Sequence, residues 1–443
     1  MKIQKITARE ILDSRGFPTV ECCLELGDEG SHNRKVWSSV PSGASVGQFE
    51  AIELRDGDMS RFGGKGVLKA IYNIEQVIAP GLIGKAPDIL TTDKYLIELD
   101  GTENKSKLGA NALLAVSMAV ARAQALCANQ PLFKLLNDVF CKRACKSAHP
   151  AVPGVASREA WEFVEGALVM PTCMYNIING GAHADSGITF QEFMIMPKNQ
   201  KTVADSVRIA STVYHELKKI LKEAGYSTNI GDEGGFAPRI LGNGLEKELT
   251  ALKLLVKAIK QAGFSEKEVV LCLDVAASQF YDNKKQVYII DGKPMQPKEL
   301  VAFYVKLVAE FPLYSIEDGM SEDDAVGWQL LTKELGHKVQ IVGDDIFVTN
   351  KSRIQAGIND KIANSVLIKL NQIGTVTETW QAIKLSKDNN YTTVVSHRSG
   401  ETNDSFIADL VVGCAAGQIK AGAPARGERV AKYNRLMEIE KSL

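Results

Sequence analysis

Short β-rich runs that each end in a polar residue recur through the second half of the chain, and they constrain the fold more than any other feature. The runs are VVLCLD, LYSIE, VQIVGDD, VLIK and TVVSH, at Val269–Asp274, Leu313–Glu317, Val339–Asp345, Val366–Lys369 and Thr393–His397. Segments with helical periodicity lie between them, such as Lys298–Glu310 and Thr375–Asp388. Strand and helix alternating every roughly 25–40 residues are typical of βα units with a parallel sheet. Repeated this often, the pattern predicts a β/α barrel.

The first part of the chain indicates a different arrangement, with strands first and helices after them. Residues 3–26 alternate loosely and carry a turn at Asp13–Gly16, which predicts a small antiparallel sheet. Helical stretches follow from about 67 to 80 and from about 110 to 137. We therefore expect an α+β domain over residues 1–140, a divergent linker or insertion over 141–168, and the barrel over 169–443.

Length and charge narrow the class of protein. A chain of 443 residues is too long for one small core, and a formal net charge of −1 gives no global sign of nucleic-acid or membrane partners. The longest apolar stretch, Asn111 to Ala128, contains Arg122 and Gln124, which favours a buried Ala-rich helix over a membrane span. The N-terminus lacks the apolar segment of a signal peptide, and the eight scattered cysteines are expected to be reduced thiols. We therefore expect a cytoplasmic protein.

The carboxylates that close three successive runs are the main indication of chemistry. They are Asp274, Glu317 and Asp344, and the chemistry of a β/α barrel lies at the carboxyl ends of its strands. Any one of them alone would more often be a helix cap or an exposed side chain. Three ionised carboxylates at one mouth raise each other's pKa, and a hard divalent cation relieves that repulsion. The sequence therefore predicts a magnesium site.

The next runs end in cationic or titratable residues. Lys369 lies in an otherwise apolar run, and beside a dication its ammonium pKa should fall, which would make it a general base near neutral pH. His397, Arg398 and Ser399 follow the last run, where a strand-to-helix turn of this composition forms a good phosphate site. An exposed arginine with a capping serine would explain the same turn. Lys420 would add a further cation, although alone it would be an ordinary surface lysine.

Two glycine-rich stretches bring more acids and an imidazole. NGGAHAD contains His183 and leads to Gln191 and Glu192, and GDEGGFAP contains Glu233. A carboxylate flanked by glycines can approach a ligand closely, because no Cβ keeps the backbone away. Such loops are equally often plain turns, and a lone histidine there is more often structural than catalytic.

At the level of these motifs the chain resembles the enolases over nearly its whole length. The matching motifs are AREILDSRG, VPSGASVGQFEAIELRDGD, NIINGGAHAD, QEFMIMP, GDEGGFAP, LDVAAS, SIEDG, VGDD, LIKLNQIGT, SHRSGET and GQIKAGAPARGER. LIKLNQIGT together with SHRSGET is highly specific, whereas GGAHA by itself is not. The resemblance implies an α/β fold: a modified eight-fold β/α barrel of the TIM type with an N-terminal α+β capping domain.

The resemblance also implies an activity, a cofactor and an assembly. The activity is that of a hydro-lyase of glycolysis and gluconeogenesis, which reversibly dehydrates 2-phospho-D-glycerate to phosphoenolpyruvate. Two Mg²⁺ ions per active site are implied, the first held by Asp274, Glu317 and Asp344, the second bound with substrate and helped by Ser45. The family is usually homodimeric or a ring of dimers. Its members also occur at cell surfaces and in RNA-processing assemblies, for which this sequence carries no signal.

Residue roles follow from the same resemblance. Lys369 would remove the C2 proton, and Glu233 would protonate the departing C3 hydroxyl, with Glu192 and His183 beside it as catalytic residues. Since hydroxide is a poor leaving group, Glu233 must then carry a proton near neutral pH. The implied substrate contacts are Ser45, His183, Gln191, Glu192, Lys369, His397, Arg398, Ser399 and Lys420.

Two other interpretations stay open beside an active enolase. An acid-sugar or muconate-type member of the same superfamily would share the barrel and the three carboxylates, but it would not need the SHRSG turn or the SGAS loop. A catalytically weak paralogue with a binding or structural role finds its main support in the divergent segment 138–168. Cys141, Cys145 and His149 stand there at helical spacing, but a structural zinc normally takes four ligands, so we do not expect a metal site.

Overall fold

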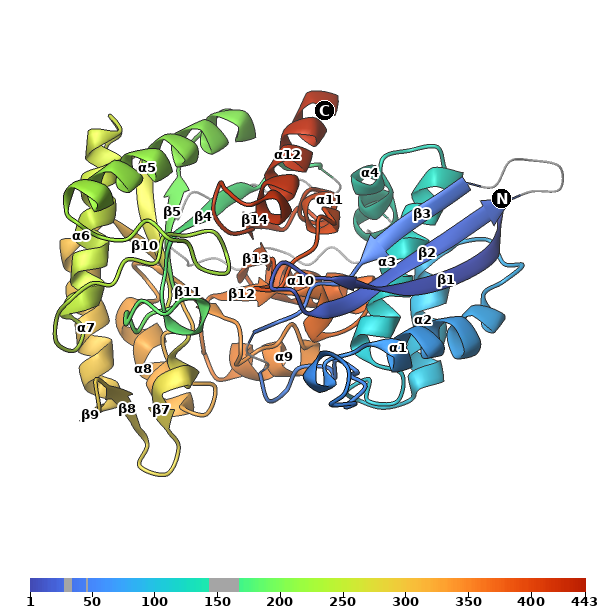
Figure 1. Cartoon of the computed structure of the whole chain (residues 1–443), viewed down its shortest axis with the longest axis horizontal. Coiled ribbons are helices and arrows are strands. Elements are labelled where there is room, and N and C mark those ends of the chain that lie inside the picture. Colours follow the sequence, from blue (N-terminus) through green and yellow to red (C-terminus); the bar gives the residue numbers. More distant parts are fainter. Residues whose placement is uncertain (28–33, 45–46, 143–166) are drawn as a thin grey trace.

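The structure is a computed structural model that describes residues 1–27, 34–44, 47–142 and 167–443. Figure 1 shows a small sheet with its helices on one side of the molecule and a closed barrel on the other. The predicted insertion over 141–168 therefore falls outside the described residues except at its two ends, and so do Cys145 and His149. The side chain of Cys141 is not described either.

The N-terminal sheet has the order β1-β2-β3 and is antiparallel, as the sequence predicted. Its strands are β1 (Lys2–Leu12), β2 (Pro18–Gly27) and β3 (Arg34–Ser39). The turn between β1 and β2 forms because the Asp13 carboxylate accepts hydrogen bonds from the backbone N–H groups of Arg15 and Phe17, at 2.8 and 2.9 Å. Gly16 supplies the positive φ, +78°, that this turn requires.

Helices cover one face of this sheet. They are α1 (Leu68–Tyr72), α2 (Ile89–Asp100), α3 (Ala110–Cys127) and α4 (Leu132–Leu136), with the short turns η1 (Phe62–Gly64), η2 (Asn73–Ile78), η3 (Ala79–Gly81) and η4 (Asn137–Lys142). The helical stretch predicted from about 110 to 137 is confirmed over α3 and α4, with one interruption where the chain turns after Cys127. Asn129 takes a left-handed φ of +51°, and Pro131, which lacks an N–H, precedes α4.

The Ala-rich helix α3 forms the centre of this half of the molecule. Among the described residues it is the one helix that is long and apolar enough to cross a membrane by length and composition, and 78% of that stretch is buried inside the protein. It contacts β2 and β3, and the small alanine side chains let the helix and the strands approach closely. The prediction of a buried Ala-rich helix is confirmed.

The closed barrel has the strand order β10-β11-β12-β13-β14-β4-β5-β6. Its strands are β4 (Thr172–Asn179), β5 (Glu192–Pro197), β6 (Val269–Asp274), β10 (Leu313–Glu317), β11 (Gln340–Gly343), β12 (Ser365–Ile368), β13 (Thr392–Ser396) and β14 (Gly417–Lys420). The outer helices are α5 (Val203–Glu223), α6 (Glu246–Gln261), α7 (Pro297–Glu310), α8 (Ala325–Leu335), α9 (Lys351–Asn359), α10 (Val376–Asp388), α11 (Phe406–Gly413) and α12 (Gly427–Ser442). A small side sheet and three short turns complete it: β7 (Tyr281–Asp282), β8 (Val287–Ile290), β9 (Lys293–Met295), η5 (Gly181–His183), η6 (Ala277–Phe280) and η7 (Leu370–Gln372). The predicted barrel is confirmed.

One strand departs from the all-parallel barrel that the βα pattern predicted. β5 pairs antiparallel with both β4 and β6. The reason is the connection: residues 180–191 between β4 and β5 carry only the one-turn η5, whereas a parallel return is usually made through a full helix that crosses back along the sheet. As a result the first residue of β5, rather than its last, lies at the carboxyl-end mouth of the barrel.

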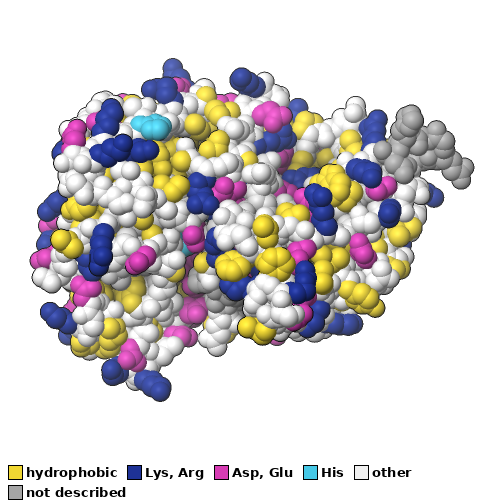
Figure 2. Space-filling view, viewed as in Figure 1, with side chains coloured by type: hydrophobic (Ala, Val, Ile, Leu, Met, Phe, Trp, Pro, Cys, Tyr) yellow, Lys and Arg dark blue, Asp and Glu magenta, His cyan; other side chains and the backbone are white. Residues whose placement is uncertain are grey.

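Charged side chains are mixed by sign over the face shown in Figure 2, with lysine and arginine interspersed among aspartate and glutamate. The formal net charge of −1 over the whole chain agrees with this pattern. The larger concentration of charge is internal and lies at the mouth of the barrel, as described below.

A buried ion pair joins the N-terminal helices to the barrel. Arg122 of α3 donates from Nη1 and Nη2 to the two carboxylate oxygens of Asp404, at 2.6 and 2.7 Å. Asp404 also accepts from the backbone N–H groups of Ser39 and Phe406. Burial raises the pKa of Asp404, but Arg122 outweighs it, so the net pKa lies below the ordinary value.

We expect Asp404→Asn to lower the free energy of unfolding by about 3 kcal/mol at neutral pH, because it leaves the largely buried Arg122 without its carboxylate. A depressed carboxyl pKa stabilises the fold above the unfolded-state value, about 3.9, and the contribution is lost as the pH falls through the folded-state value. Urea titrations of both proteins from pH 7 to pH 3 should therefore show a difference that shrinks in acid. The control is Glu21→Gln, which breaks the exposed Arg9–Glu21 pair and should cost less than about 1 kcal/mol. Equal stability of the Asp404 variant and the wild type at pH 7 would contradict this account.

Candidate active site at the mouth of the barrel

The two-residue period of a β-strand brings the candidate residues together. The barrel interior is filled by Met174, Met194, Met196, Cys272, Val342, Leu367 and Val394. Along each strand, every second side chain points into the barrel. On β6, Cys272 is therefore followed by Asp274, and Asp344 and Lys369 hold the equivalent positions at the ends of β11 and β12. Since β5 runs the opposite way, its first residue, Glu192, pairs with Asp274 at the same mouth.

A polar pocket at this mouth collects nearly all of the predicted site residues. It is lined by Gly43, Ala44, His183, Gln191, Glu192, Glu233, Asp274, Ala276, Asp318, Asp344, Asp345, Lys369, Ser396, His397, Arg398, Ser399 and Lys420. Glu317 lies directly beside it, since it accepts a hydrogen bond from Lys420. Ser45, the remaining predicted residue, falls outside the described residues.

Lys420 is the counterion of three buried carboxylates. Its Nζ lies 2.7 Å from Glu317 and 3.2 Å from both Asp274 and Glu192. Burial raises the pKa of Glu317 well above its usual range, and the neighbouring Asp274 raises it further. Burial lowers the pKa of Lys420, but these carboxylates outweigh it and hold the pKa well above the ordinary lysine value. Lys420 thus lies at the site as a further cation rather than at the surface, since its side chain is 3% exposed.

Lys369 forms an ion pair with Asp344, the last of the three predicted metal ligands. Burial lowers the pKa of Lys369, but Asp344 outweighs it, so the net pKa is raised. The predicted fall applies to Lys369 beside a dication that shares the charge of Asp344, so it stays a prediction. Asp344 is itself buried, and Lys369 outweighs the burial and lowers its pKa. Gln372 donates to the other oxygen of Asp344, at 2.9 Å.

The chemistry of the donor set fits a divalent cation. Six carboxyl groups line the pocket, from Glu192, Glu233, Asp274, Asp318, Asp344 and Asp345, against the three cationic side chains of Lys369, Arg398 and Lys420. Oxygen atoms of Asp318, Asp344 and Asp345 lie within 4.8 Å of one another. Burial and the neighbouring Asp344 raise the pKa of Asp345 to about 8. Such an excess of buried carboxylates is relieved by a hard cation. Only Asp344 of the acidic cluster Asp318, Asp344 and Asp345 belongs to the predicted triad Asp274, Glu317 and Asp344, so that triad stays a prediction.

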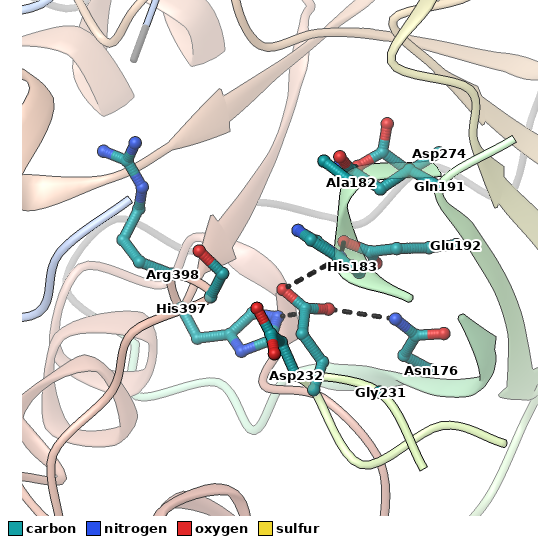
Figure 3. Close-up of polar contacts among 12 residues, drawn as sticks. Asn176, Ala182, His183, Gln191, Glu192, Gly231, Asp232, Asp274, His397 and Arg398 are labelled. Carbon is teal, nitrogen blue, oxygen red and sulfur yellow. Dashed lines mark hydrogen bonds and ion pairs between the residues drawn. The ribbon is translucent and has the colours of Figure 1, made fainter. Parts of the chain in front are cut away.

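Glu233 lies between two histidines opposite Glu192. His183 Nδ1 is 3.6 Å from Oε1 of Glu233, His397 Nε2 is 3.4 Å from Oε2, and Asn176 donates to Oε2 at 2.9 Å. In Figure 3, His183 and Glu192 approach this carboxylate from one side and His397 from the other. The glycines of GDEGGFAP permit this arrangement, since a Cβ on Gly231 would lie only 2.6 Å from the backbone oxygen of His183.

Glu192 and Glu233 are a coupled pair of buried carboxyl groups. Burial raises the pKa of Glu192 well above its usual range, and Glu233 raises it further. Burial also raises the pKa of Glu233, but His183 and His397 outweigh it and bring the pKa well below the ordinary value. Two carboxyl groups coupled in this way titrate as a unit, so a shared proton belongs to the pair rather than to one member. The expectation that Glu233 carries a proton near neutral pH stays a prediction.

Arg398 is held by residues that the sequence analysis did not select. Its Nη1 donates to Glu50 at 2.9 Å and to Asn371 at 2.8 Å, and its Nη2 donates to the other oxygen of Glu50 at 3.1 Å. Burial lowers the pKa of this guanidinium, but Glu50 outweighs it and the net pKa is raised. Glu50 belongs to the segment that follows the Gly43–Gly47 loop. This segment therefore fixes the position of Arg398, which is a predicted phosphate-binding residue.

The sequence analysis also missed Asn176, Asp318 and Asp345. Asp318 accepts hydrogen bonds from the backbone N–H groups of Asp344 and Asp345, at 2.8 and 3.0 Å, so it shapes the loop after β11. Both aspartates directly follow predicted ligands, in the doublets Glu317-Asp318 and Asp344-Asp345. Asn176 is the one polar side chain in the run MYNII. Two sequence features could have indicated these residues. One is a second aspartate directly after a predicted ligand at a strand end, and the other is an amide side chain within an apolar strand.

The fold and the site together define a class of protein. A closed TIM-type barrel whose carboxyl-end mouth holds a lysine, a coupled carboxyl pair and a candidate cation site is the framework of an acid–base enzyme. Comparison with protein families agrees: residues 3–136 match the family model for the enolase N-terminal domain, and residues 167–443 match that for the enolase C-terminal TIM barrel domain. The chain belongs to the enolase family. It is a lyase-type enzyme of the enolase superfamily, in a family that is generally magnesium-dependent.

Proposed function

We propose that this chain is a magnesium-dependent enolase that interconverts 2-phospho-D-glycerate and phosphoenolpyruvate. The observation that carries the proposal is the composition of one pocket. It places Lys369, the Glu192–Glu233 pair and Arg398 around the same space, so that a base, an acid and an anion-binding group face one ligand. Each of the three corresponds to one chemical requirement of the reaction.

The first requirement is removal of a proton next to a carboxylate. Such a proton is very weakly acidic, and its loss leaves a dianionic ene-diolate that needs concentrated positive charge. Mg²⁺ held by Asp274, Glu317 and Asp344 would share the charge of Asp344 and neutralise that of the substrate carboxylate. A cation that draws the charge of Asp344 away from Lys369 would lower the raised pKa of Lys369, whose neutral form would then take the C2 proton through Nζ. Lys420 supplies fixed positive charge beside Glu317.

The second requirement is a proton for the departing C3 hydroxyl. We assign this proton to the buried Glu192–Glu233 pair, in which burial and Glu233 raise the pKa of Glu192. His183 stands within 4 Å of both carboxylates, at 3.9 Å from Glu192 and 3.6 Å from Glu233. The pair can therefore deliver a proton without first drawing one from bulk water.

The third requirement is a site for the phosphate. Arg398 and Ser399 lie at the turn after β13, and the guanidinium is pre-oriented by Glu50 and Asn371. An arginine that is already fixed loses little conformational entropy when it binds a phosphate. Gln191 and His397 complete the proposed lining. Gln191 donates to Asp274 at 3.2 Å and so lies beside the proposed metal ligands.

The experiment that tests the proposal is an ultraviolet assay of phosphoenolpyruvate formation from 2-phospho-D-glycerate, with 5 mM chelator or added Mg²⁺ at about millimolar concentration. We expect product only with the metal. The Lys369→Ala protein, purified in the same way, controls for enolase carried over from the expression host. No product from folded protein with Mg²⁺, combined with turnover of a muconate-type or sugar-acid substrate, would replace the proposal with the superfamily alternative. No product from any of them would favour a paralogue with a binding role.

The assembly, the location and the domain limits predicted from the sequence stay predictions. We propose a homodimer, and size-exclusion chromatography with light scattering measures that directly.

A further inference from the structure

Arg429 is a fully buried cation that lies behind the site and outside the pocket lining. It belongs to α12, and its side chain is 0% exposed. Its Nη1 lies 2.5 Å from Nδ1 of His397 and donates to the backbone oxygen of Arg398 at 2.6 Å. Its Nη2 donates to the backbone oxygens of Asp232 and Ser399, at 3.0 and 2.6 Å. The guanidinium thus joins the loop that carries Glu233 to the turn after β13.

The contact with His397 determines which ring nitrogen carries the proton. A guanidinium has five N–H donors and no acceptor, so a nitrogen that faces it at hydrogen-bond distance must present its lone pair. Nδ1 of His397 is therefore the acceptor, and the single proton of the neutral ring lies on Nε2. Among the described residues Nε2 has no partner with hydrogen-bond geometry, and Oε2 of Glu233 lies 3.4 Å from it. Burial also lowers the pKa of His397 to about 3, which agrees with a neutral ring.

We propose that Arg429 is a positioning residue that locks His397 in the Nε2–H tautomer and thereby aims an N–H donor at Glu233. Oε2 of Glu233 then faces two donors, the amide of Asn176 at 2.9 Å and the imidazole of His397. Oε1, on the side of His183, is left as the oxygen that exchanges the proton. The other tautomer would turn a lone pair toward the carboxylate and repel it.

The contacts of Arg429 fix the position of the Glu233 carboxylate as well as that of His397. Asp232 directly precedes Glu233, and its backbone oxygen is fixed by the guanidinium that also fixes His397. A shift of α12 would therefore move the donor and the carboxylate together. A buried partner that fixes an imidazole tautomer is a recognised means of maintaining acid–base geometry.

The direct test is the ring nitrogen spectrum of ¹⁵N-histidine-labelled protein, which needs no substrate. The chain has six histidines, and His397→Gln identifies the signal of interest by its loss. We expect an unprotonated Nδ1 and a protonated Nε2 at neutral pH in the wild type. A protonated Nδ1, or a doubly protonated ring at pH 7, would overturn the proposal without reference to any activity.

Two variants test the link to Arg429. Arg429→Lys keeps the charge but cannot make the forked contacts, and Arg429→Met removes both. We expect each folded variant to show mixed tautomers at His397. The matched control is Arg435→Lys on the same helix, whose guanidinium pairs with Asp409 and Glu438. It should keep the wild-type histidine spectrum and wild-type kinetics.

The kinetic arm rests on the proposed function. With 2-phospho-D-glycerate we expect Arg429→Lys to lower kcat about 10- to 100-fold, with KM nearly unchanged, because Arg429 does not line the pocket. A rise in KM with normal kcat, or lowered kcat with an unaltered histidine spectrum, would reduce Arg429 to a structural role. If the wild type itself fails to turn over this substrate, the proposed function fails, while the spectra still decide the tautomer.

Discussion

Replacing Lys369 with alanine should lower kcat by about 10⁴-fold, the upper range for loss of a positioned general base, and should leave the fold intact. Lys369 occupies the inward position just past β12 and is paired with Asp344 inside the pocket. Among the described residues no other lysine forms an ion pair with Asp344, so none takes the place of the lost Nζ. The loss should appear in the proton-transfer step itself. We therefore expect exchange of the C2 hydrogen of 2-phospho-D-glycerate with deuterated solvent, followed by proton NMR, to stop in the variant.

The control for this variant is Lys384→Ala on α10. Lys384 pairs with Asp388 four residues on, at the surface, so its loss tests the effect of removing a lysine without touching the pocket. Its turnover and its C2 exchange rate should match the wild type. Near-normal exchange in the Lys369 variant would remove Lys369 from the role of base, and Lys420 would then be examined for that role.

Replacing Asp344 with asparagine should raise the Mg²⁺ concentration for half-maximal activity on the order of 100-fold. By Coulomb's law one unit charge about 4 Å from a dication is worth about 8 kcal/mol at an effective dielectric constant near 20, and the smaller desolvation cost of the neutral amide offsets the greater part of that loss. Calorimetric titration of the folded variant with Mg²⁺ should show the same weakening in the absence of substrate. The melting temperature of the wild type should rise with added Mg²⁺, and that of the variant should rise less.

Asp388→Asn serves as the matched control, because it removes an exposed carboxylate of the same type. Its magnesium titration should superimpose on that of the wild type. An unchanged midpoint for the Asp344 variant in both calorimetry and activity would count against the proposed ligand set. Asp318 and Asp345 of the acidic cluster would then be the next candidate ligands for Mg²⁺.

The barrel and most of its site could be predicted because both depend on local patterns. Strand ends that carry Asp274, Glu317 and Lys369 are visible as a polar residue after an apolar run, and the period of two places each of them inward. The antiparallel β5 was not predicted, since its direction depends on what the β4–β5 loop lacks rather than on its own residues. Helix α2 was missed although Asp88 caps its start and Gly101 ends it at a φ of +69°.

The charge states at the site could not be read from the sequence, because they depend on contacts between distant segments. Burial raises the pKa of Glu233, but His183 and His397, which come from other segments of the chain, outweigh it and lower the pKa. Glu50 holds Arg398 across 348 positions of chain. A single sequence shows which residues face the mouth of a barrel, but their pKa values depend on neighbours that the tertiary fold brings together.

The pairing of β14 with β4 has a consequence for how this protein is made. β4 is the first barrel strand to be synthesised and β14 the last, and their hydrogen bonds close the barrel. The helix that carries Arg429 follows β14 and ends the described chain. A nascent chain on the ribosome thus holds an open barrel with two unpaired edges until β14 has been made. The pocket is incomplete until then, because Lys420 ends β14, and the open barrel is the stage at which chaperones have most to protect.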